Sequence, residues 1–261
     1  MQMSGNTILI TGGTSGIGRG LAEAFHRQGE QVIISGRRSG LLDEIVAAHP
    51  GMAAFQVDVN DPEALQALAG EIGVAFPGLN VLVNNAGVTR HEDLAGEAMD
   101  LAVSQSIIET NIFGVLRTTA AFLPILKRQP HATIITTTSG LGFVPRSVYP
   151  TYSATKAFLH SWMQSLRTQL SKSSVEVLEL PPPYVQTELG GPAQATDPSA
   201  MPLADYIEEV MQRLAGPPPS NGEILVRRVT PLRMAERNGD YEKIYAAMNQ
   251  DEALSPLTLP I

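Results

Sequence analysis

The sequence predicts an α/β fold in which helices cover a mostly parallel sheet. Short runs rich in apolar and β-branched residues alternate with helical patterns from the N-terminus onward, as in repeated strand–helix–strand units. A length of 261 residues is enough for one large domain of this class or for two small ones. Because we find neither an internal repeat nor a clear linker, we predict a single domain over residues 1–261.

In the first third of the chain, four predicted strands alternate with helices. The first helix places Leu21, Ala24 and Phe25 on one face, which suits packing against a sheet. Asp61 and Pro62 suit the cap and the first turn of the third helix. The predicted strands are Thr7–Thr11, Gln31–Ser35, Ala53–Val57 and Asn80–Asn84, and the helices are Ile17–Gln28, Leu41–Ala48 and one that begins at Asp61.

The remainder of the chain continues this alternation. A long helical stretch contains Pro124, around which we expect a break or a kink. Proline cannot donate hydrogen bonds within a sheet, so Pro181–Pro183 should end the sixth strand. The predicted strands are Thr133–Thr138, Val175–Leu180 and Glu223–Val226, and the helices are Ala98–Arg128, Thr151–Ser171, Leu203–Leu214 and a last one around Arg233–Met248.

The segment Thr187–Ser220 differs in composition, because it is rich in Pro, Ala, Gly and Met. We interpret residues 187–220 as a small insertion or lid on the same domain. The alternative is a disordered segment, since long stretches of this kind often lack fixed structure.

Composition and charge exclude several classes of function. A net charge of −8 and a pI near 5.1 argue against nucleic acid or an anionic membrane as the main partner. The chain has no cysteine, which excludes disulfides, thiolate catalysis and zinc–thiolate sites. Its five histidines are scattered without an H-x-x-x-H pair, so we predict no metal centre. The N-terminus lacks a secretory pattern and no apolar stretch reaches membrane-spanning length, so we expect a cytoplasmic protein.

A glycine-rich turn follows the first predicted strand and opens the first helix. It reads Thr11-Gly12-Gly13-Thr14-Ser15-Gly16-Ile17-Gly18, with the spacing G-x-x-x-G-x-G. Glycines let backbone N–H groups approach a pyrophosphate closely, and the start of a helix favours its negative charge. Glycine also serves in ordinary turns and caps, so the strand–turn–helix context is what favours dinucleotide binding.

The end of the second strand indicates which dinucleotide is bound. An acidic residue there would bind the 2′-hydroxyl of the ribose and favour NAD, whereas this chain has Gly36-Arg37-Arg38. Two guanidinium groups suit a 2′-phosphate, which they can hold through paired hydrogen bonds. We therefore expect NADP, with NAD as the alternative. Arg38 in particular could instead belong to an ordinary solvated turn.

The residue types for proton transfer lie around the helix at 151–171. Tyr152 and Lys156 are four residues apart and so share one face of that helix, and Ser139 lies a short segment upstream. A phenol has an unperturbed pKa of about 10, and a neighbouring ammonium favours its ionised form. We expect Lys156, together with a bound cationic ring, to lower the pKa of Tyr152 toward neutrality. The three residues then form an acid–base group for a hydroxyl or carbonyl oxygen.

Further motifs place the chain in a recognisable pattern. They are Asp58-Val59, Asn84-Asn85-Ala86-Gly87 and Asn111, which stand in order between the TGGTSGIG turn, Ser139 and Tyr152-x-x-x-Lys156. With these motifs the chain resembles the short-chain dehydrogenase/reductase family over nearly its full length. Within that family it is similar to the oxidoreductases named after the D-alanylation of lipoteichoic acid, a label that fixes no substrate.

The resemblance implies a fold and a reaction. The fold is a doubly wound, mostly parallel, seven-stranded Rossmann-type sheet flanked by helices. The reaction is reversible hydride transfer between a nicotinamide cofactor and a small-molecule carbonyl or secondary alcohol. The resemblance also implies a homodimer or homotetramer paired through two long helices. A dinucleotide-sensing regulatory protein without turnover is the rival, although such a protein would be expected to lose the tyrosine or the lysine.

The resemblance assigns a role to each matching residue. Tyr152 exchanges a proton with the substrate oxygen, Ser139 donates a hydrogen bond to that oxygen, and Lys156 also holds the nicotinamide ribose. Asn111 anchors a water that relays protons to Lys156. The alternative role for Asn111 is that of a polar helix residue that caps a local kink. The implied cofactor contacts are Gly12, Thr14, Ser15, Gly16, Ile17, Gly18, Arg37, Arg38, Asp58, Val59, Asn85, Ala86, Gly87, Tyr152, Lys156, Val185 and Thr187. Asn84 is expected to tie neighbouring strands.

The chain departs from the family pattern after the sixth strand. Pro183 stands where the family has glycine, which removes one N–H group, while Val185 and Thr187 remain. We therefore expect nicotinamide binding to survive in this segment. The substrate side is less informative; the apolar candidates for its lining are Leu141, Phe143, Val144, Tyr149, Tyr184, Leu189 and Met201, each of which could equally be core or lid packing.

Overall fold

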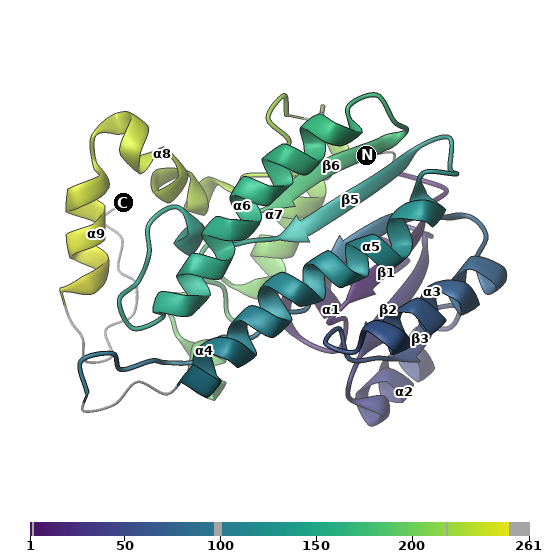
Figure 1. Cartoon of the computed structure of the whole chain (residues 1–261), viewed down its shortest axis with the longest axis horizontal. Coiled ribbons are helices and arrows are strands. Elements are labelled where there is room, and N and C mark those ends of the chain that lie inside the picture. The colour runs from purple at the N-terminus through teal and green to yellow at the C-terminus, as the bar shows by residue number, and fades with distance from the viewer. Residues whose placement is uncertain (2, 97–100, 218, 251–261) are drawn as a thin grey trace.

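The computed structural model describes residues 1, 3–96, 101–217 and 219–250. Its centre is a sheet in which all neighbouring strands are parallel, in the order β3-β2-β1-β4-β5-β6 (Figure 1). This confirms the predicted α/β class with a parallel sheet. The strands are β1 (Thr7–Thr11), β2 (Gln31–Gly36), β3 (Ala53–Gln56), β4 (Leu79–Asn84), β5 (Ala132–Thr137) and β6 (Val175–Leu180).

Helices cover both faces of this sheet. Residues of α1, α2, α7 and α8 pack into one apolar cluster with the sheet, and residues of α3, α5 and α6 pack into another. Figure 1 shows α3, α5 and α6 in front of the strands and α1 and α7 behind them. The helices are α1 (Gly16–Arg27), α2 (Ser39–Ala48), α3 (Pro62–Ala75), α4 (Leu101–Ile108), α5 (Gly114–Leu126), α6 (Pro150–Leu170), α7 (Leu203–Ala215), α8 (Thr230–Asn238) and α9 (Tyr241–Asn249).

The strands are apolar at nearly every position because both of their faces are buried. Successive side chains of a strand point to opposite faces. In β1, Ile8 and Ile10 therefore pack into the cluster with α1 and α7, while Leu9 packs into the cluster with α3 and α5. All three side chains are fully buried. This explains why the strands were recognisable as continuous apolar runs rather than alternating ones.

The predicted seventh strand at Glu223–Val226 does not form. Among the described residues, this segment makes a single bridge, between Glu223 and Glu179 at the free edge of β6. The backbone N–H of Gly222 donates to the oxygen of Pro219, and Pro181, which follows β6, has no N–H to donate, so the ladder does not extend in either direction. The described sheet therefore has six strands, and the expectation of seven was wrong in this detail.

The long helix predicted at Ala98–Arg128 is divided at a different place from the one expected. Its first three residues lie outside the described part of the chain. Beyond them, α4 and α5 are separated by a π-helical turn at Glu109–Phe113, whereas Pro124 lies inside α5. A π turn forms where a helix accommodates a local constraint. Here Asn111 supplies it, because its side-chain amide bonds both backbone groups of Val88.

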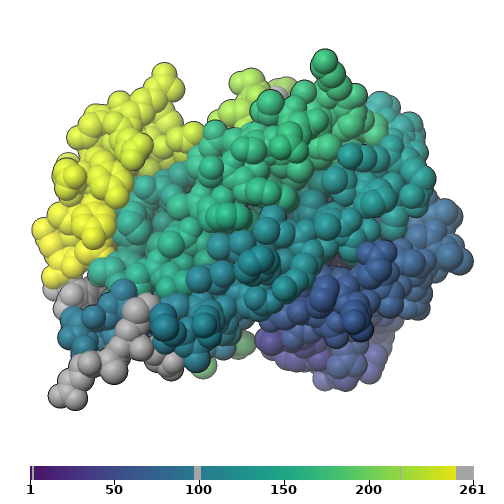
Figure 2. Space-filling model, viewed as in Figure 1, coloured from purple at the N-terminus to yellow at the C-terminus, as the bar shows by residue number. Residues whose placement is uncertain are grey.

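The C-terminal region also differs from its prediction. The helix expected at Arg233–Met248 is two helices, α8 and α9, because Gly239 adopts a left-handed φ of 75° that ends α8. Figure 2 shows these two helices as a projecting lobe at one end of the molecule. In the region interpreted as a lid, α7 buries Tyr206 and Val210 completely, so this helix is part of the layer on the sheet. None of the described helices combines the length and the apolar character needed to span a membrane.

Candidate active site

A cavity of about 450 Å³ lies at the carboxyl ends of the central strands. The chain leaves β1 toward α1 on one face of the sheet and leaves β4 toward α5 on the other. Such a divergence opens a crevice at the strand ends, where ligands bind in open α/β sheets. The predicted site residues that line this cavity are Gly12, Thr14, Ser15, Gly16, Ile17, Arg37, Arg38, Asp58, Val59, Asn85, Ala86, Gly87, Ser139, Tyr152, Lys156, Val185 and Thr187. The structure therefore brings together seventeen of the nineteen predicted residues, and Gly18 and Asn111 lie outside the lining.

The glycine-rich turn forms one wall of the cavity. Gly12 and Gly16 have positive φ angles of 67° and 53°, which other residues rarely adopt. Ser15 is the N-cap residue of α1, but it makes no capping hydrogen bond, and the first turn of α1 holds no acidic side chain. The first N–H groups of α1 therefore lack a side-chain cap, which suits an anionic group at this helix start.

Gly18 has a structural position rather than a lining one. A Cβ atom at this residue would lie 2.3 Å from Nδ2 of Asn85 and 2.4 Å from the backbone oxygen of Gly12. Asn85 in turn donates from Nδ2 to the backbone oxygens of Thr11 and Gly12. Gly18 thus lets α1 pack against the turn and against the loop after β4, and it shapes the cavity without facing it.

Two arginines lie at the end of β2, as the sequence indicated. Arg38 donates from Nη2 to Oγ1 of Thr14 at 2.8 Å and to Oγ of Ser15 at 2.9 Å. Its guanidinium therefore joins the start of α2 to the glycine-rich turn. Arg37 is exposed, and its Nη1 lies 3.9 Å from a carboxylate oxygen of Asp58.

The loop after β4 is fixed by hydrogen bonds to β1. Oγ1 of Thr11 accepts from the backbone N–H groups of Asn85 and Ala86 at 3.0 and 3.1 Å. Asn84 is fully buried and donates to Thr119 and Thr136, as expected for a residue that ties neighbouring elements. The segment Asn85–Gly87 therefore presents its backbone to the middle of the cavity.

Tyr152, Lys156 and Ser139 meet at the other end of the cavity. Nζ of Lys156 lies 5.5 Å from the centre of the Tyr152 ring and donates to the backbone oxygen of Thr137 at 2.9 Å. The hydroxyl of Ser139 is hydrogen-bonded to that of Tyr152. All three side chains are at least nine-tenths buried. The spacing of four residues on α6 thus places the phenol and the ammonium on one side, as the sequence predicted.

Burial shifts the pKa of the tyrosine and that of the lysine in opposite directions. Burial raises the pKa of Tyr152 to about 12, although the hydrogen bond from Ser139 acts in the opposite direction. Burial also lowers the pKa of Lys156 to about 8, against the negative charge of Glu179. Among the protein's own groups, desolvation thus outweighs the interactions that favour the phenolate. The lowering expected from Lys156 together with a bound cationic ring stays a prediction. At neutral pH the phenol is protonated, which is the form that can donate a proton.

Asn111 lies behind this group rather than in the cavity wall. It is fully buried in the π turn, and its side chain accepts from the N–H of Val88 and donates to the Val88 oxygen and to Oγ1 of Thr155. These contacts fix the strand exit after Gly87 against α6. The geometry agrees with the alternative considered for Asn111, a polar residue at a local irregularity of the helix.

The segment after β6 closes the cavity on one side. Pro183, Val185 and Thr187 all line it. The proline that stands in place of glycine at position 183 therefore does not move this segment away from the cavity. Of the apolar candidates for the substrate side, Leu141, Tyr149, Tyr184 and Leu189 line the cavity. Phe143 instead packs edge-on against His160, Val144 is buried in the core, and Met201 pairs with Val185.

Sequence reasoning missed residues that support the site. Glu92 is buried in the loop after β4, and its carboxylate accepts from the backbone N–H and the hydroxyl of Thr151 and from the hydroxyl of Ser104. A negative charge at the start of α6 stabilises the helix that carries Tyr152. Arg146 and Gln194 also line the cavity. No local motif marks Glu92, because its partner Thr151 is 59 residues away in the sequence.

Comparisons with known proteins agree with this site. The sequence model of the short chain dehydrogenase family matches residues 6–198. An uncharacterized oxidoreductase of Bacillus subtilis, DltE, is 40% identical over 97% of this chain and 100% of its own length. The structure of an alcohol dehydrogenase from the archaeon Thermococcus sibiricus, complexed with 5-hydroxy-NADP, is similar with a TM-score of 0.76 and 26% identity, over 86% of this chain and 97% of that one.

A further structure shows the extent of the fold. A short chain dehydrogenase/reductase from Burkholderia phymatum, in complex with NAD, has a TM-score of 0.79 at 23% identity and covers 98% of this chain and 99% of that one. A cavity built on a glycine-rich turn, with a tyrosine and a lysine one helical turn apart, thus occurs together with a family match over most of the chain. The chain therefore belongs to the short-chain dehydrogenase/reductase family of oxidoreductases.

Proposed function

We propose that this enzyme is an NADP-preferring oxidoreductase that transfers hydride reversibly between nicotinamide and a carbonyl or secondary alcohol, with Tyr152 as the general acid and base. The observation that supports this most strongly is the convergence of Tyr152, Lys156 and Ser139 on the same cavity as the glycine-rich turn. A hydride donor and a proton donor must both reach the same carbonyl group, so one cavity has to hold both.

The cavity residues fit a dinucleotide in one orientation. The uncapped start of α1 suits the pyrophosphate, and Asp58 with the two arginines suits the adenosine end. Gly87 lies close to Lys156, since a Cβ atom at Gly87 would be 3.8 Å from its Nζ, and Asn85–Gly87 suit the middle of the dinucleotide. Val185 and Thr187 line the same cavity, and Thr187 lies against Gly16 of the glycine-rich turn. When bound, the nicotinamide supplies or accepts the hydride.

The protein's own groups account for the proton. Tyr152, protonated because burial raises its pKa, donates to the oxygen of the carbonyl. Ser139 donates a hydrogen bond to the same oxygen and stabilises its developing negative charge. Lys156 faces the Tyr152 ring and stabilises the phenolate that results. In the alcohol direction the same steps run in reverse.

The preference for NADP rests on Arg37 and Arg38. The ion pair of Arg37 with Asp58 is long and exposed, so little stabilisation is lost if its guanidinium turns to a 2′-phosphate. We predict that Arg37→Asp raises KM for NADPH by about 10- to 100-fold, since charged hydrogen bonds contribute about 1.5–3 kcal/mol. KM for NADH should stay within about twofold, because NADH has no 2′-phosphate. Equal effects on both cofactors in steady-state kinetics would refute the assignment, and NAD would then be the cofactor.

The rival is a protein that binds a dinucleotide without turnover. Purified protein incubated with NADPH and a panel of ketones and aldehydes distinguishes the two. We expect loss of the nicotinamide absorbance with at least one carbonyl compound. NADPH binding without oxidation by any member of the panel would favour the sensing protein.

We further propose a homodimer or homotetramer that pairs through α5 and α6. Two large apolar side chains, Phe113 just before α5 and Phe158 on α6, are more than two-fifths exposed. Exposed aromatic side chains on such helices suit a subunit contact. A mass of 27.9 kDa by light scattering, that of a single chain, would contradict this proposal. A cytoplasmic location, and no nucleic acid or membrane as partner, remain predictions from the sequence.

A further inference from the structure

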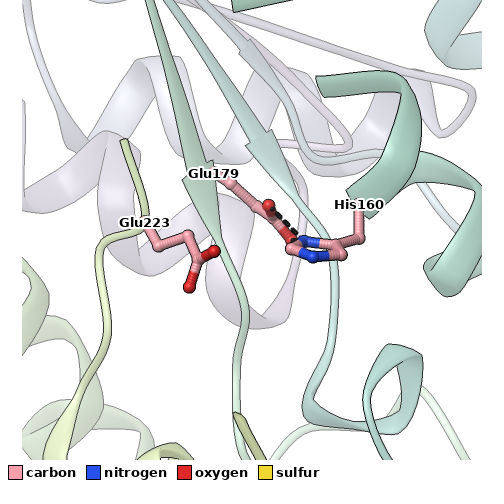
Figure 3. A group of neighbouring side chains, drawn as sticks. All are labelled: His160, Glu179 and Glu223. Carbon is pink, nitrogen blue, oxygen red and sulfur yellow. Dashed lines mark hydrogen bonds and ion pairs between the residues drawn. The ribbon is translucent and has the colours of Figure 1, made fainter. Parts of the chain in front are cut away.

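A buried group of charged side chains lies directly behind the catalytic tyrosine and lysine. His160 is one helical turn beyond Lys156 on α6, so Tyr152, Lys156 and His160 form a single stripe on this helix. Glu179 projects from β6 toward this stripe, and Glu223 lies beside it on the segment that bridges to β6. Figure 3 shows Glu179 between Glu223 and His160, with the imidazole ring facing the Glu179 carboxylate.

The carboxylate of Glu179 is held from two directions. Its Oε2 lies 2.8 Å from Nδ1 of His160, and its Oε1 accepts from the hydroxyl of Thr138 at 2.8 Å. Thr138 directly follows Thr137, whose backbone oxygen accepts from Nζ of Lys156. A short path of two hydrogen bonds and one residue of backbone therefore connects the Lys156 ammonium with the Glu179 carboxylate.

Glu223 is equally buried but is already neutralised. Arg233 donates from Nε and Nη2 to its two carboxylate oxygens at 2.6 and 2.8 Å. Such a bidentate pair satisfies both the charge and the lone pairs of the carboxylate. Arg233 also interacts with the charge of Glu179, but both of these hydrogen bonds go to Glu223, and among the described residues no arginine forms such a bidentate pair with Glu179. Its nearest groups able to carry positive charge on α6 are His160 and Lys156.

The three ligand-type side chains lie close enough to hold a cation, since His160, Glu179 and Glu223 offer atoms within 4.8 Å of one another. We nevertheless interpret them as a network of ion pairs and hydrogen bonds. Arg233 occupies both oxygens of Glu223, and its guanidinium would repel a metal ion at this point. The oxygens of Glu179 are likewise bonded to Thr138 and His160.

A fully buried carboxylate is costly unless an opposite charge lies near it. The buried ammonium of Lys156 is costly for the same reason, because its Nζ donates to an uncharged backbone oxygen and not to a carboxylate. Opposite charges held on the adjacent residues Thr137 and Thr138 stabilise each other, because burial screens their attraction less than bulk water would. The pKa of Lys156 agrees with this, since the charge of Glu179 opposes the lowering caused by burial.

We propose that Glu179 is a positioning residue for the reaction: its carboxylate, held by His160 and Thr138, keeps Lys156 charged and directed at Tyr152. The inference rests on the proposed function for its catalytic consequence. It adds a residue on β6 to the side chains that determine the proton transfer. His160 and Thr138 act through Glu179; Thr138 also lines the cavity, whereas Glu179 and His160 are not among the residues that line it.

The expected result is a change in the pH profile of carbonyl reduction. Reduction needs charged Lys156, so its rate falls as pH rises through the pKa of that residue. Removal of the Glu179 charge lowers the pKa of Lys156 further below its ordinary value. We expect Glu179→Gln to move the alkaline midpoint of kcat/KM to lower pH by about one unit, since a nearby charge shifts a pKa by about 1–3 units. KM for NADPH measured well below that midpoint should stay within about twofold.

Glu223→Gln is the matched control. It removes a second buried carboxylate from the same group, but one whose charge Arg233 already balances. We expect it to lower the melting temperature while the alkaline midpoint stays in place. An equal shift in both variants would overturn the proposal. It would indicate that the pKa of Lys156 responds to the total charge nearby and not to Glu179 in particular. If the wild type is active and the alkaline midpoint of Glu179→Gln equals that of the wild type, the proposal is also overturned.

Two further measurements keep the test independent of folding and of turnover. Should Glu179→Gln fail to fold, Glu179→Met removes the charge with an apolar side chain of similar volume, and the same shift is expected. The chain has four lysines, so the titration of Lys156 can be followed by NMR of its side chain in each variant. A lowered pKa of Lys156 in the absence of activity would support Glu179 and refute only the proposed function. An unchanged pKa would overturn the proposal itself.

Discussion

Replacement of Tyr152 by Phe is expected to lower kcat for carbonyl reduction by about 10³-fold, the usual effect of removing a positioned general acid. The change removes one hydroxyl and leaves the ring in place on α6. The hydroxyl that is lost is the one bonded to Ser139, on a ring that faces Lys156. The dissociation constant of NADPH should change by less than about threefold, because the loss falls mainly on the transition state.

Tyr206→Phe provides the matched control for this substitution. Tyr206 is fully buried on α7, and its hydroxyl makes no hydrogen bond within the part of the chain that the structure describes. The same chemical change there should leave kcat unaltered and keep or raise stability, because an unpaired buried hydroxyl is removed. Steady-state kinetics and NADPH titration of both variants decide the matter. Turnover by Tyr152→Phe close to that of the wild type would show that another group donates the proton.

Gly18→Ala should be the most damaging of the small substitutions in the glycine-rich turn. Its new methyl group would lie 2.3 Å from Nδ2 of Asn85 and 2.4 Å from the Gly12 oxygen, distances that no rotation of the side chain can relieve. The helix or the loop after β4 must move, at a cost of about 3 kcal/mol in the free energy of unfolding. Because the same movement displaces the uncapped start of α1, NADPH binding should be lost or severely weakened.

Gly70→Ala is the control for this prediction. Gly70 lies within α3, and a Cβ atom there meets nothing within 4 Å. Alanine should therefore stabilise the protein by about 0.5–1 kcal/mol through its better helix propensity. Denaturant unfolding and NADPH titration compare the two variants. A Gly18→Ala protein as stable as the wild type, with unchanged affinity, would show that the turn is not packed as described.

The local elements of this fold could be predicted because they depend on neighbouring residues. The strands β1 and β6 match their predicted bounds, since continuous apolar runs identify strands that are buried on both faces. The cap at Asp61 is also confirmed, because its side chain accepts from the N–H groups of Glu63 and Ala64. The pairing of Tyr152 with Lys156 on one side of α6 follows from helical spacing alone.

The features that were missed depend on contacts between distant segments. The π turn at Glu109–Phe113 requires the hydrogen bonds between Asn111 and Val88, and no sequence pattern near Asn111 predicts these bonds. The segment Glu223–Val226 has the composition of a strand, but its pairing stops because the N–H of Gly222 donates to Pro219 and Pro181 has no N–H. Desolvation of Tyr152 likewise depends on packing, which the sequence does not reveal. For the same reason, nothing in the sequence distinguishes Glu179 from the other residues of β6.

The transfer of deuterium from C4-deuterated NADPH to the product alcohol would test the proposed reaction most directly. Mass spectrometry of the products from the carbonyl panel should find one deuterium on the former carbonyl carbon with the wild-type protein, and almost none with Tyr152→Phe. Bound NADPH that passes no deuterium to any carbonyl compound, or equal transfer by the two proteins, would contradict the assignment of Tyr152 as the proton donor beside a docked nicotinamide.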